Sequence, residues 1–196
     1  MNTTQTENPT MTQPYERESK FLCFVLRHTR DPEVMGVTLD TQGWADIEQL
    51  LAACQRAKHP VDAAILKQIV ATDEKGRYAF SVDGLKVRCL QGHSSPMVDL
   101  DFEEKDPPPT LFHGTVLTVA ESILSQGLWP QKRHYVHLSR DLETATNVGG
   151  RRKGELVVFQ VDTRALSATG RKFYQSENEV WLTDHVPAAY LRRLDI

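Results

Sequence analysis

The segment Asp99–Thr110 divides the chain into two parts. Its sequence, DLDFEEKDPPPT, places five acidic residues and one lysine before three consecutive prolines. Proline cannot continue an α-helix or a central β-strand, and consecutive prolines favour an extended, semi-rigid backbone. We therefore expect residues 99–110 to be an acidic, proline-rich linker between two lobes, the first covering residues 14–98 and the second residues 111–196.

The N-terminal segment 1–13 is polar and has neither an apolar core nor a basic leader, so we expect a disordered tail rather than a signal peptide. No stretch is long and apolar enough to span a membrane. With 40% hydrophobic and 25% charged residues, the 196-residue chain has the composition of a soluble protein. Cys23, Cys54 and Cys89 lack CxxC spacing, which argues against a disulfide framework or zinc site and favours a reducing, cytoplasmic location.

Helical spacing of apolar residues predicts three helices in the first lobe. One covers Glu16–Thr29, one includes IEQLLAAC after the turn at Gln42–Gly43, and one lies in HPVDAAILKQIVATD with Pro60 near its first turn. The runs RYAFS and LKVRC alternate about Val82–Gly84 and predict a two-stranded ribbon. Three helices and a ribbon suggest a winged-helix lobe, a frequent nucleic-acid-binding architecture.

Charge favours a local pocket over a wholly basic binding face. The formal net charge is -3, and residues 1–100 hold eleven Lys and Arg against thirteen Asp and Glu. Many nucleic-acid binders are instead strongly basic. Any anion site must therefore be assembled from a few local cations.

Short strands separated by short helices predict an α+β arrangement in the second lobe. We expect strands in TLFHGT, HYVHLS and GELVVFQVD, and a strand pair or bulged strand in KFYQSENEVWLTDHV. Helices are expected in VAESILSQG, closed by Gly127, and in RDLETATNVGG. The nearly continuous apolar run GELVVFQVD is typical of a strand buried on both faces.

The turn FHGT is a candidate binding element of the second lobe. It places His113 at a strand end, Gly114 lets backbone approach a ligand closely, and Thr115 can donate its hydroxyl there. A tight turn with a capping threonine would explain the same three residues, so both interpretations stay open.

A second candidate is the polar stripe in RHYVHLS. His137 and Ser139 lie on the same side of the strand as Tyr135 and Arg133, because strand side chains alternate. The stripe is too polar for a core face and indicates either a site or an exposed edge strand. The glycine-rich loop holding Arg151–Lys153 could grip phosphate, although a solvated hairpin tip has the same composition.

The first lobe offers cations at two places. The helix in FLCFVLRHTRDP ends with Arg27, His28 and Arg30, and the helix dipole alone favours cations there by about 0.3–1 kcal/mol each. Arg77 opens the ribbon, and His93 lies in the flexible segment QGHS that follows it. Helix-end and turn chemistry explain these residues as well as an anion site does.

Several common catalytic motifs are missing from the sequence. It contains no GxxxxGK[ST] phosphate loop, no HExxH, no GxSxG elbow and no GxGxxG dinucleotide motif. The common hydrolase and Rossmann-type interpretations therefore lose support, and no metal site is expected.

Seven segments in order, SKFLCFVLRH, GWADIEQLL, RYAFS, QGHS, LFHGT, RHYVHLS and KFYQSENEVWLTDHVP, resemble the RNA 2'-phosphotransferase family, the NAD-dependent tRNA phosphotransferases. The resemblance runs from Ser19 to the C-terminus and preserves order and spacing. It implies an N-terminal winged-helix RNA-binding lobe followed by a C-terminal lobe of the ADP-ribosyltransferase fold. It also implies a monomer whose partners are 2'-phosphorylated RNA and NAD+, with no metal.

The resemblance implies a two-step reaction at an internal 2'-phosphate of the kind left by tRNA splicing. The RNA 2'-phosphate attacks the anomeric carbon of NAD+ and expels nicotinamide, giving a 2'-phospho-ADP-ribosylated RNA intermediate. The 2''-hydroxyl of ADP-ribose then attacks that phosphate. The products are RNA with a 2'-hydroxyl and ADP-ribose 1'',2''-cyclic phosphate.

The family's catalytic tetrad maps by motif onto Arg27, His28, Arg77 and Arg133. Three guanidiniums can make charge-assisted, partly bidentate contacts with a phosphate dianion and stabilise charge on its oxygens. The imidazole of His28 can hold a phosphate oxygen or manage a proton.

The resemblance also implies residues for NAD+. His113, Gly114 and Thr115 match the strand that holds the adenosine-side ribose, and the second strand and following loop contribute His137, Leu138, Ser139 and Gly149. Related transferases carry a glutamate on a third strand, where this chain has Val180. An acceptor that is already an anion needs no such base.

Two other functions compete with this one. A plain ADP-ribosyltransferase, modifying nucleic-acid phosphate ends or protein, would share the NAD fold, but it would not need the complete tetrad. A winged-helix regulator that senses NAD+ would require tight duplex binding, against which the acidic balance of the first lobe argues.

Overall fold

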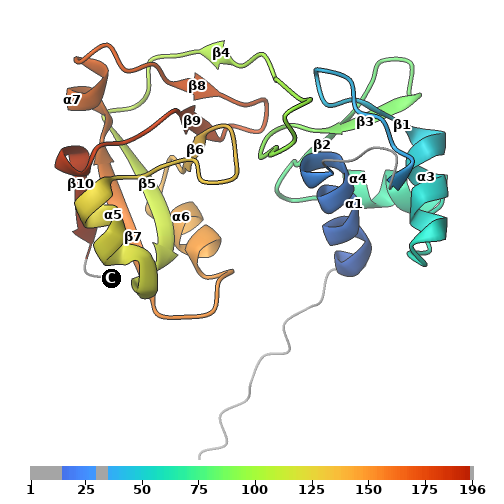
Figure 1. The fold of residues 1–196 in the computed structure, drawn as a ribbon, viewed down its shortest axis with the longest axis horizontal. Coiled ribbons are helices and arrows are strands. Elements are labelled where there is room, and N and C mark those ends of the chain that lie inside the picture. The colour runs from blue at the N-terminus through green and yellow to red at the C-terminus, as the bar shows by residue number, and fades with distance from the viewer. Residues whose placement is uncertain (1–14, 30–34, 195–196) are drawn as a thin grey trace, which may run out of the picture.

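A computed structural model describes residues 15–29 and 35–194, which form two lobes joined by an extended connector (Figure 1). The predicted tail at residues 1–13 and the cation Arg30 lie outside the described residues. Helices and sheets occur in both lobes, which confirms the α+β class. None of the helices described is both long and apolar enough to cross a bilayer.

Within the described residues the first lobe shows helices α1, α3 and α4 and one antiparallel sheet, and the predicted helices and ribbon are confirmed. Its elements are α1 (Glu16–His28), β1 (Ala45–Asp46), α3 (Ile47–Arg56), α4 (Ala63–Ala71), β2 (Tyr78–Phe80) and β3 (Lys86–Cys89). The sheet order is β1-β3-β2. The two-residue strand β1 was not predicted, because it is too short to show alternation. Helix α4 begins after Asp62, whose side chain accepts from the Ile65 N–H, so Pro60 precedes the first turn.

Apolar stripes hold the first lobe together. Leu22, Val25 and Leu26 on α1 are fully buried against residues of the other helices and of the sheet. Burial of such side chains stabilises a fold by about 1.5–3 kcal/mol each. The stripe fixes how α1 rotates about its axis and therefore where its C-terminal residues Arg27 and His28 are presented.

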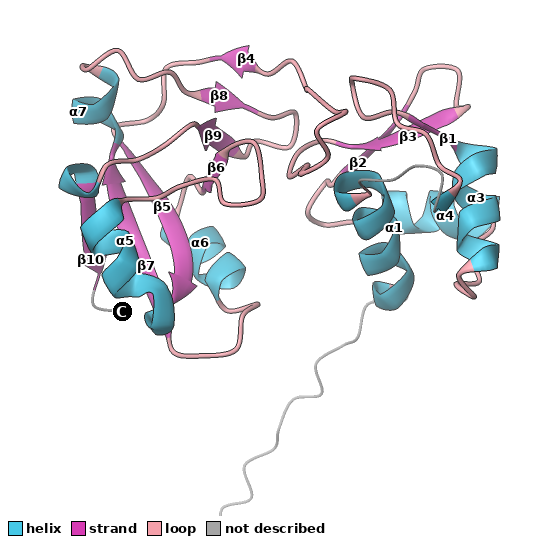
Figure 2. Cartoon of the chain, in the orientation of Figure 1, coloured by secondary structure: helices cyan, strands magenta, loops and turns pink. Residues whose placement is uncertain are grey.

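The second lobe contains two antiparallel sheets and several short helices (Figure 2). One sheet has the order β10-β7-β5 and the other β4-β8-β9-β6. Their strands are β4 (Glu103–Glu104), β5 (Thr110–Val116), β6 (Val136–Leu138), β7 (Leu156–Asp162), β8 (Tyr174–Gln175), β9 (Trp181–Thr183) and β10 (Leu191–Leu194). The helical elements are η1 (Leu117–Val119), α5 (Ala120–Gln126), α6 (Leu142–Gly149), α7 (Thr163–Ser167) and η2 (Ala188–Tyr190).

The two sheets of this lobe meet where the candidate motifs lie. The N–H of Phe112 on β5 donates to the carbonyl of Ser139, and the Ser139 N–H donates back, at 2.8 and 2.7 Å. Strand β6 is thus an edge strand of its own sheet but is joined to β5 at one end. The predicted buried strand is confirmed as β7, with Val158 and Phe159 fully buried.

The acidic segment Asp99–Thr110 does more than connect the lobes. Its residues Glu103–Glu104 form β4 and pair with Tyr174–Gln175 of β8. Phe102 packs against the first-lobe core and also against the Tyr135 ring, with centroids 5.6 Å apart. Residues Phe102–Glu104 therefore contact both lobes.

A turn of the second lobe also touches the first. In the β8–β9 turn, Glu177 forms an ion pair with Arg88. The amide of Asn178 donates to the Lys75 carbonyl at 3.0 Å, beside the start of the ribbon. These contacts connect the second lobe to Arg88 and to Lys75, which precedes Arg77 by two residues.

Candidate active site

Arg27 is the most unusual residue of the predicted tetrad, because its charged group is buried. The residue is 9% exposed, and Nε and Nη2 of its guanidinium are buried without a hydrogen-bond partner. Gly92, with φ +88°, packs against it, and a Cβ there would lie in ordinary contact 3.5 Å from the guanidinium carbon. A desolvated charge without an acceptor costs free energy, so this position is suited to receive an anion.

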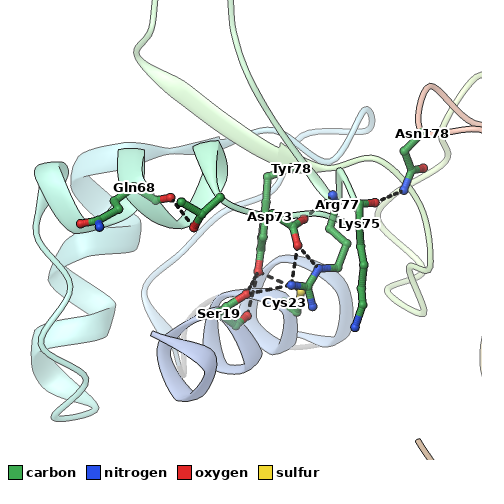
Figure 3. Close-up of polar contacts among 9 residues, drawn as sticks. Ser19, Cys23, Gln68, Asp73, Lys75, Arg77, Tyr78 and Asn178 are labelled. Carbon is green, nitrogen blue, oxygen red and sulfur yellow. Dashed lines mark hydrogen bonds and ion pairs between the residues drawn. The ribbon is translucent and has the colours of Figure 1, made fainter. Parts of the chain in front are cut away.

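Arg77 is held in place by Asp73 (Figure 3). Its Nε and Nη2 donate to Asp73 Oδ1 at 2.9 and 2.6 Å, and its backbone N–H donates to Oδ2 at 2.5 Å. Nη2 also donates to the Ser19 hydroxyl on α1 at 3.2 Å. Although burial opposes the charge, the hydrogen bond to Asp73 raises the pKa of Arg77. The guanidinium is therefore a fixed cation with a fixed direction.

His28 lies at the end of α1, half-buried, with Nδ1 3.0 Å from the Ser94 hydroxyl. The Ser94 N–H donates to the Arg27 carbonyl at 2.9 Å, so the QGHS segment closes the end of the helix. Burial, and then the positive charges of Arg27 and Arg133, lower the pKa of His28. The imidazole is therefore predominantly neutral near pH 7 until an anion arrives.

Cations of the second lobe converge on the same place. Arg133 is reached by solvent but is partly desolvated by surrounding protein, and this desolvation, followed by the charges of Arg27 and Arg152, lowers its pKa. Arg151 is likewise reached by solvent, and desolvation by the surrounding protein, followed by the charges of Arg77 and Arg27, lowers its pKa. Such mutual effects require short separations. The fold therefore brings Arg27, His28 and Arg133 near one another from both lobes, and Arg77 near Arg151, although the net charge of the chain is -3.

Two histidines of the second lobe present acceptor nitrogens. His113 Nδ1 lies 3.1 Å from the His137 carbonyl and His137 Nδ1 lies 2.9 Å from the Tyr135 carbonyl, so both Nδ1 atoms must donate. Burial, followed by the charge of Arg133, lowers the pKa of His137 to about 3. Burial also lowers the pKa of His113. Each neutral ring therefore has an unprotonated Nε2, and that of His137 is buried without a partner.

The other predicted residues of these two strands are mainly packed. Leu138 is 1% exposed within the hydrophobic core, and Thr115 is 2% exposed on β5. Ser139 is half-buried and uses its backbone to join the two sheets. Among these three residues, the side chain of Ser139 is the most accessible.

Gly114 and Gly149 allow α6 to lie directly on β5. A Cβ at Gly114 would fall 1.7 Å from the Ala145 carbonyl oxygen, and a Cβ at Gly149 would fall 2.8 Å from the Thr115 nitrogen. We expected a turn at FHGT with His113 at a strand end, but His113, Gly114 and Thr115 lie inside β5 and pair with β7. We also expected Gly114 to admit a ligand, but the backbone that approaches it is that of a helix. Close packing of α6 thus accounts for both glycines.

The remaining candidates lie near the junction of the lobes. His93 is 3% exposed with both ring nitrogens unpaired, and it lines a cavity of about 10 Å³ together with Tyr135 and His137. Val180 directly precedes β9, and its N–H donates to the Ser176 hydroxyl at 3.1 Å. A cavity of about 320 Å³ lies along the connector, but its lining contains none of the predicted site residues.

Sequence reasoning missed the residues that orient the site, above all Asp73, Ser19 and Ser94. Asp73 precedes Arg77 by four positions, and this spacing on or beside a helix is a recognisable ion-pair signal. Ser19 and Ser94 carried no such signal, because their partners are distant in sequence. Within residues 15–29 and 35–194, no group of three or more His, Cys, Asp or Glu side chains could hold a metal ion.

Substituting Asp73 by asparagine should release Arg77 without removing it. For the reaction that the family resemblance implies, we expect kcat to fall about 10- to 100-fold, since misplacing a positioned group by about 1 Å can cost that much, while KM for the implied co-substrate NAD+ stays within about twofold of wild type. Steady-state kinetics would separate the two constants. Glu74→Gln removes the neighbouring, exposed carboxylate and serves as the matched control. Equal losses of kcat in Asp73→Asn and Glu74→Gln would show that the loss of a negative charge, and not the release of Arg77, lowers kcat.

The described residues define a two-lobed α+β protein in which the buried guanidinium of Arg27 lies near Arg133 of the other lobe. The chain belongs to the RNA 2'-phosphotransferase, Tpt1 / KptA family, whose sequence profile matches residues 13–185.

Similarity to individual relatives extends over nearly the whole chain. The chain is 45% identical over 173 residues to the RNA 2'-phosphotransferase of Escherichia coli (strain K12), covering 88% of this chain and 92% of that protein. It is 42% identical over 179 residues to a probable RNA 2'-phosphotransferase of Pseudomonas fluorescens, covering 91% and 97%. A probable RNA 2'-phosphotransferase of Hahella chejuensis is 45% identical over 185 residues, covering 94% and 97%.

Proposed function

We propose that this protein removes an internal 2'-phosphate from RNA, of the kind left at a tRNA splice junction, by transferring it to NAD+. Nicotinamide and ADP-ribose 1'',2''-cyclic phosphate are the by-products. Family membership supports the RNA 2'-phosphotransferase activity. The observation that carries the proposal is the buried, unpaired guanidinium of Arg27, which gains the acceptors it lacks when a phosphate binds.

The tetrad supplies complementary groups for that phosphate. Arg77 is rigid because Asp73 holds two of its nitrogens, so it can orient one phosphate oxygen. Arg27 and Arg133 approach from different lobes and can share the remaining charge. His28 is predominantly neutral in the free protein and can accept a hydrogen bond or a proton in the phosphate-transfer step.

The second lobe offers groups that suit NAD+. Neutral Nε2 atoms on His113 and His137 are hydrogen-bond acceptors, and ribose hydroxyls are their natural donors. Arg152, whose charge lowers the pKa of Arg133 and His113, can face the pyrophosphate. When bound, NAD+ supplies an electrophilic ribose carbon with nicotinamide as the leaving group. The unpaired His137 Nε2 fits such a ligand.

The arrangement of the elements supports a division of labour between the lobes. The order α1-β1-α3-α4-β2-β3 matches that of a winged helix, and we propose that residues 14–98 bind RNA. Residues 111–196 carry two antiparallel sheets joined at Phe112 and Ser139, and we propose that they form an ADP-ribosyltransferase-type NAD lobe. Residues 99–110 connect the two.

An oligoribonucleotide with one internal 2'-phosphate tests this function directly. With NAD+ we expect loss of the 2'-phosphate and release of nicotinamide in equal amounts, and without NAD+ neither should occur. Mass spectrometry of the RNA and chromatography of the nucleotides would measure both. Phosphate loss independent of NAD+ would refute the proposed reaction. Accumulation of a stable ADP-ribosylated product would instead favour the plain ADP-ribosyltransferase.

A further inference from the structure

An exposed aromatic side chain lies beside the predicted phosphate site. Phe24 on α1 is 52% exposed, whereas the apolar stripe of the same helix is fully buried. Its ring centroid lies 6.5 Å from that of His28, with the two planes tilted by 48°. In Figure 1, α1 occupies the side of the first lobe that is turned toward the second lobe. Solitary exposed apolar residues are common, but this one lies beside His28 on the same helix.

Helix geometry places Phe24 between Arg27 and His28, the two members of the tetrad that lie on α1. At 100° per residue and viewed down the helix axis, Arg27 projects about 60° to one side of Phe24, and His28 projects about 40° to its other side. Phe24 lies about 4.5–6 Å nearer the N-terminus of α1 than they do. Side chains on a helix lean toward its N-terminus, so Arg27 and His28 lean over the turn that carries Phe24.

The next turn of the helix continues the same row. Lys20 precedes Phe24 by four residues, as Phe24 precedes His28, so the three lie along one strip of the helix surface. Its side chain is 71% exposed and its ammonium lies 2.6 Å from Glu16. An aromatic ring with cations nearby, here Lys20 and Arg27, is the pattern on which single-stranded nucleic acids bind, through base stacking and backbone attraction.

We propose that Phe24 is a stacking platform for a nucleobase next to the bound 2'-phosphate, and that it makes the strip Lys20–Phe24–His28 part of the RNA path. The inference rests on the proposed function, which places a 2'-phosphate between Arg27 and His28. The base of a nucleotide lies within a few bonds of its 2'-oxygen, and Phe24 is the aromatic ring nearest that position on α1. Because every base has a flat face, such a platform binds RNA without reading its sequence.

Fluorescence of a substituted base tests the stacking. The probe is an oligoribonucleotide with 2-aminopurine at the nucleotide bearing the 2'-phosphate, titrated without NAD+ so that no turnover occurs. We expect binding to wild type to quench the fluorescence. Phe24→Ala should abolish the quenching and weaken binding about 5- to 100-fold, as expected for loss of one stacked base. Phe24→Trp should restore both.

A second exposed aromatic provides the control. Trp129 is 54% exposed in the second lobe and stacks on His185, and Trp129→Ala should leave quenching and affinity unchanged. Circular dichroism would verify that each variant is folded. Quenching by Phe24→Ala equal to that of wild type, or affinity within about twofold, would overturn the inference.

Turnover of the unlabelled oligonucleotide tests the stacking role of Phe24 separately from the proposed removal of the 2'-phosphate. We expect Phe24→Ala to raise KM for RNA while kcat and KM for NAD+ change little. Wild-type turnover together with an unchanged KM in Phe24→Ala would overturn the platform and leave the proposed function standing. Absence of 2'-phosphate-dependent binding by wild type would overturn both.

Discussion

Replacing Arg27 by methionine should abolish turnover and leave the fold at least as stable as wild type. The guanidinium is buried with Nε and Nη2 unpaired, so the folded state bears an uncompensated desolvation cost. An apolar side chain of similar length removes that cost, and exchanges of buried charges for apolar residues are often neutral or stabilising by about 1–4 kcal/mol. Loss of an arginine that stabilises a transferring phosphate typically costs about 10³-fold or more in rate.

Two measurements on Arg27→Met distinguish a catalytic role of Arg27 from a structural one. Urea denaturation gives the change in the free energy of unfolding, and the 2'-phosphate assay gives the rate. Arg17→Met changes an exposed arginine of the same helix and should affect neither quantity by much. A marked loss of stability in Arg27→Met would assign Arg27 a structural role, and retention of more than about a tenth of the rate would remove it from the catalytic set.

Adding one methyl group at Gly114 should unfold or severely loosen the second lobe. A Cβ there would lie 1.7 Å from the Ala145 carbonyl oxygen and 2.9 Å from the Gly149 nitrogen. Both obstacles are backbone atoms of α6, so no rotamer change can relieve the overlap. The helix must move away from β5, and we expect a loss of about 3–5 kcal/mol, at the upper end for a single substitution.

Tryptophan fluorescence can localise that effect. In a Trp44→Phe background the remaining tryptophans, Trp129 and Trp181, both belong to the second lobe. Their urea transition should shift strongly for Gly114→Ala. Gly150→Ala is the matched control, because Gly150 has φ −63° and its Cβ would lie 3.3 Å from the nearest atom. Similar stability of Gly114→Ala and wild type would show that α6 does not pack as described.

Much of the fold was predictable because its signals are local. The helical spacing that predicts α1 also fixes its buried stripe, whereas the prolines at 107–109 lie between β4 and β5, after the first strand of the second lobe. Strand β1 and strand β4 were not predictable, since two residues carry no periodicity and their pairing depends on distant partners. The same holds for the five-residue helix α7, which directly follows β7 and is capped at its N-terminus by Asp162.

The candidate site divides in the same way. The sequence by itself determined which residue types are present: Arg27 and His28 at a helix end, Arg77 before a ribbon, and Arg133 before a strand. Motif order was enough to indicate the family, whose profile matches residues 13–185. From the sequence alone, however, helix-end or turn chemistry explained each of these cations as well as a phosphate site did.

Only the tertiary structure decided which of those explanations apply. Packing of the apolar stripe buries Arg27 and leaves two of its nitrogens unpaired, while Ser19 on α1 and Asp73 in the loop after α4 fix Arg77. It also showed that Gly114 accommodates α6. The physical reason is that spacing along the chain sets the direction of a side chain relative to its own element. Burial and charge convergence depend instead on how elements far apart in sequence pack together.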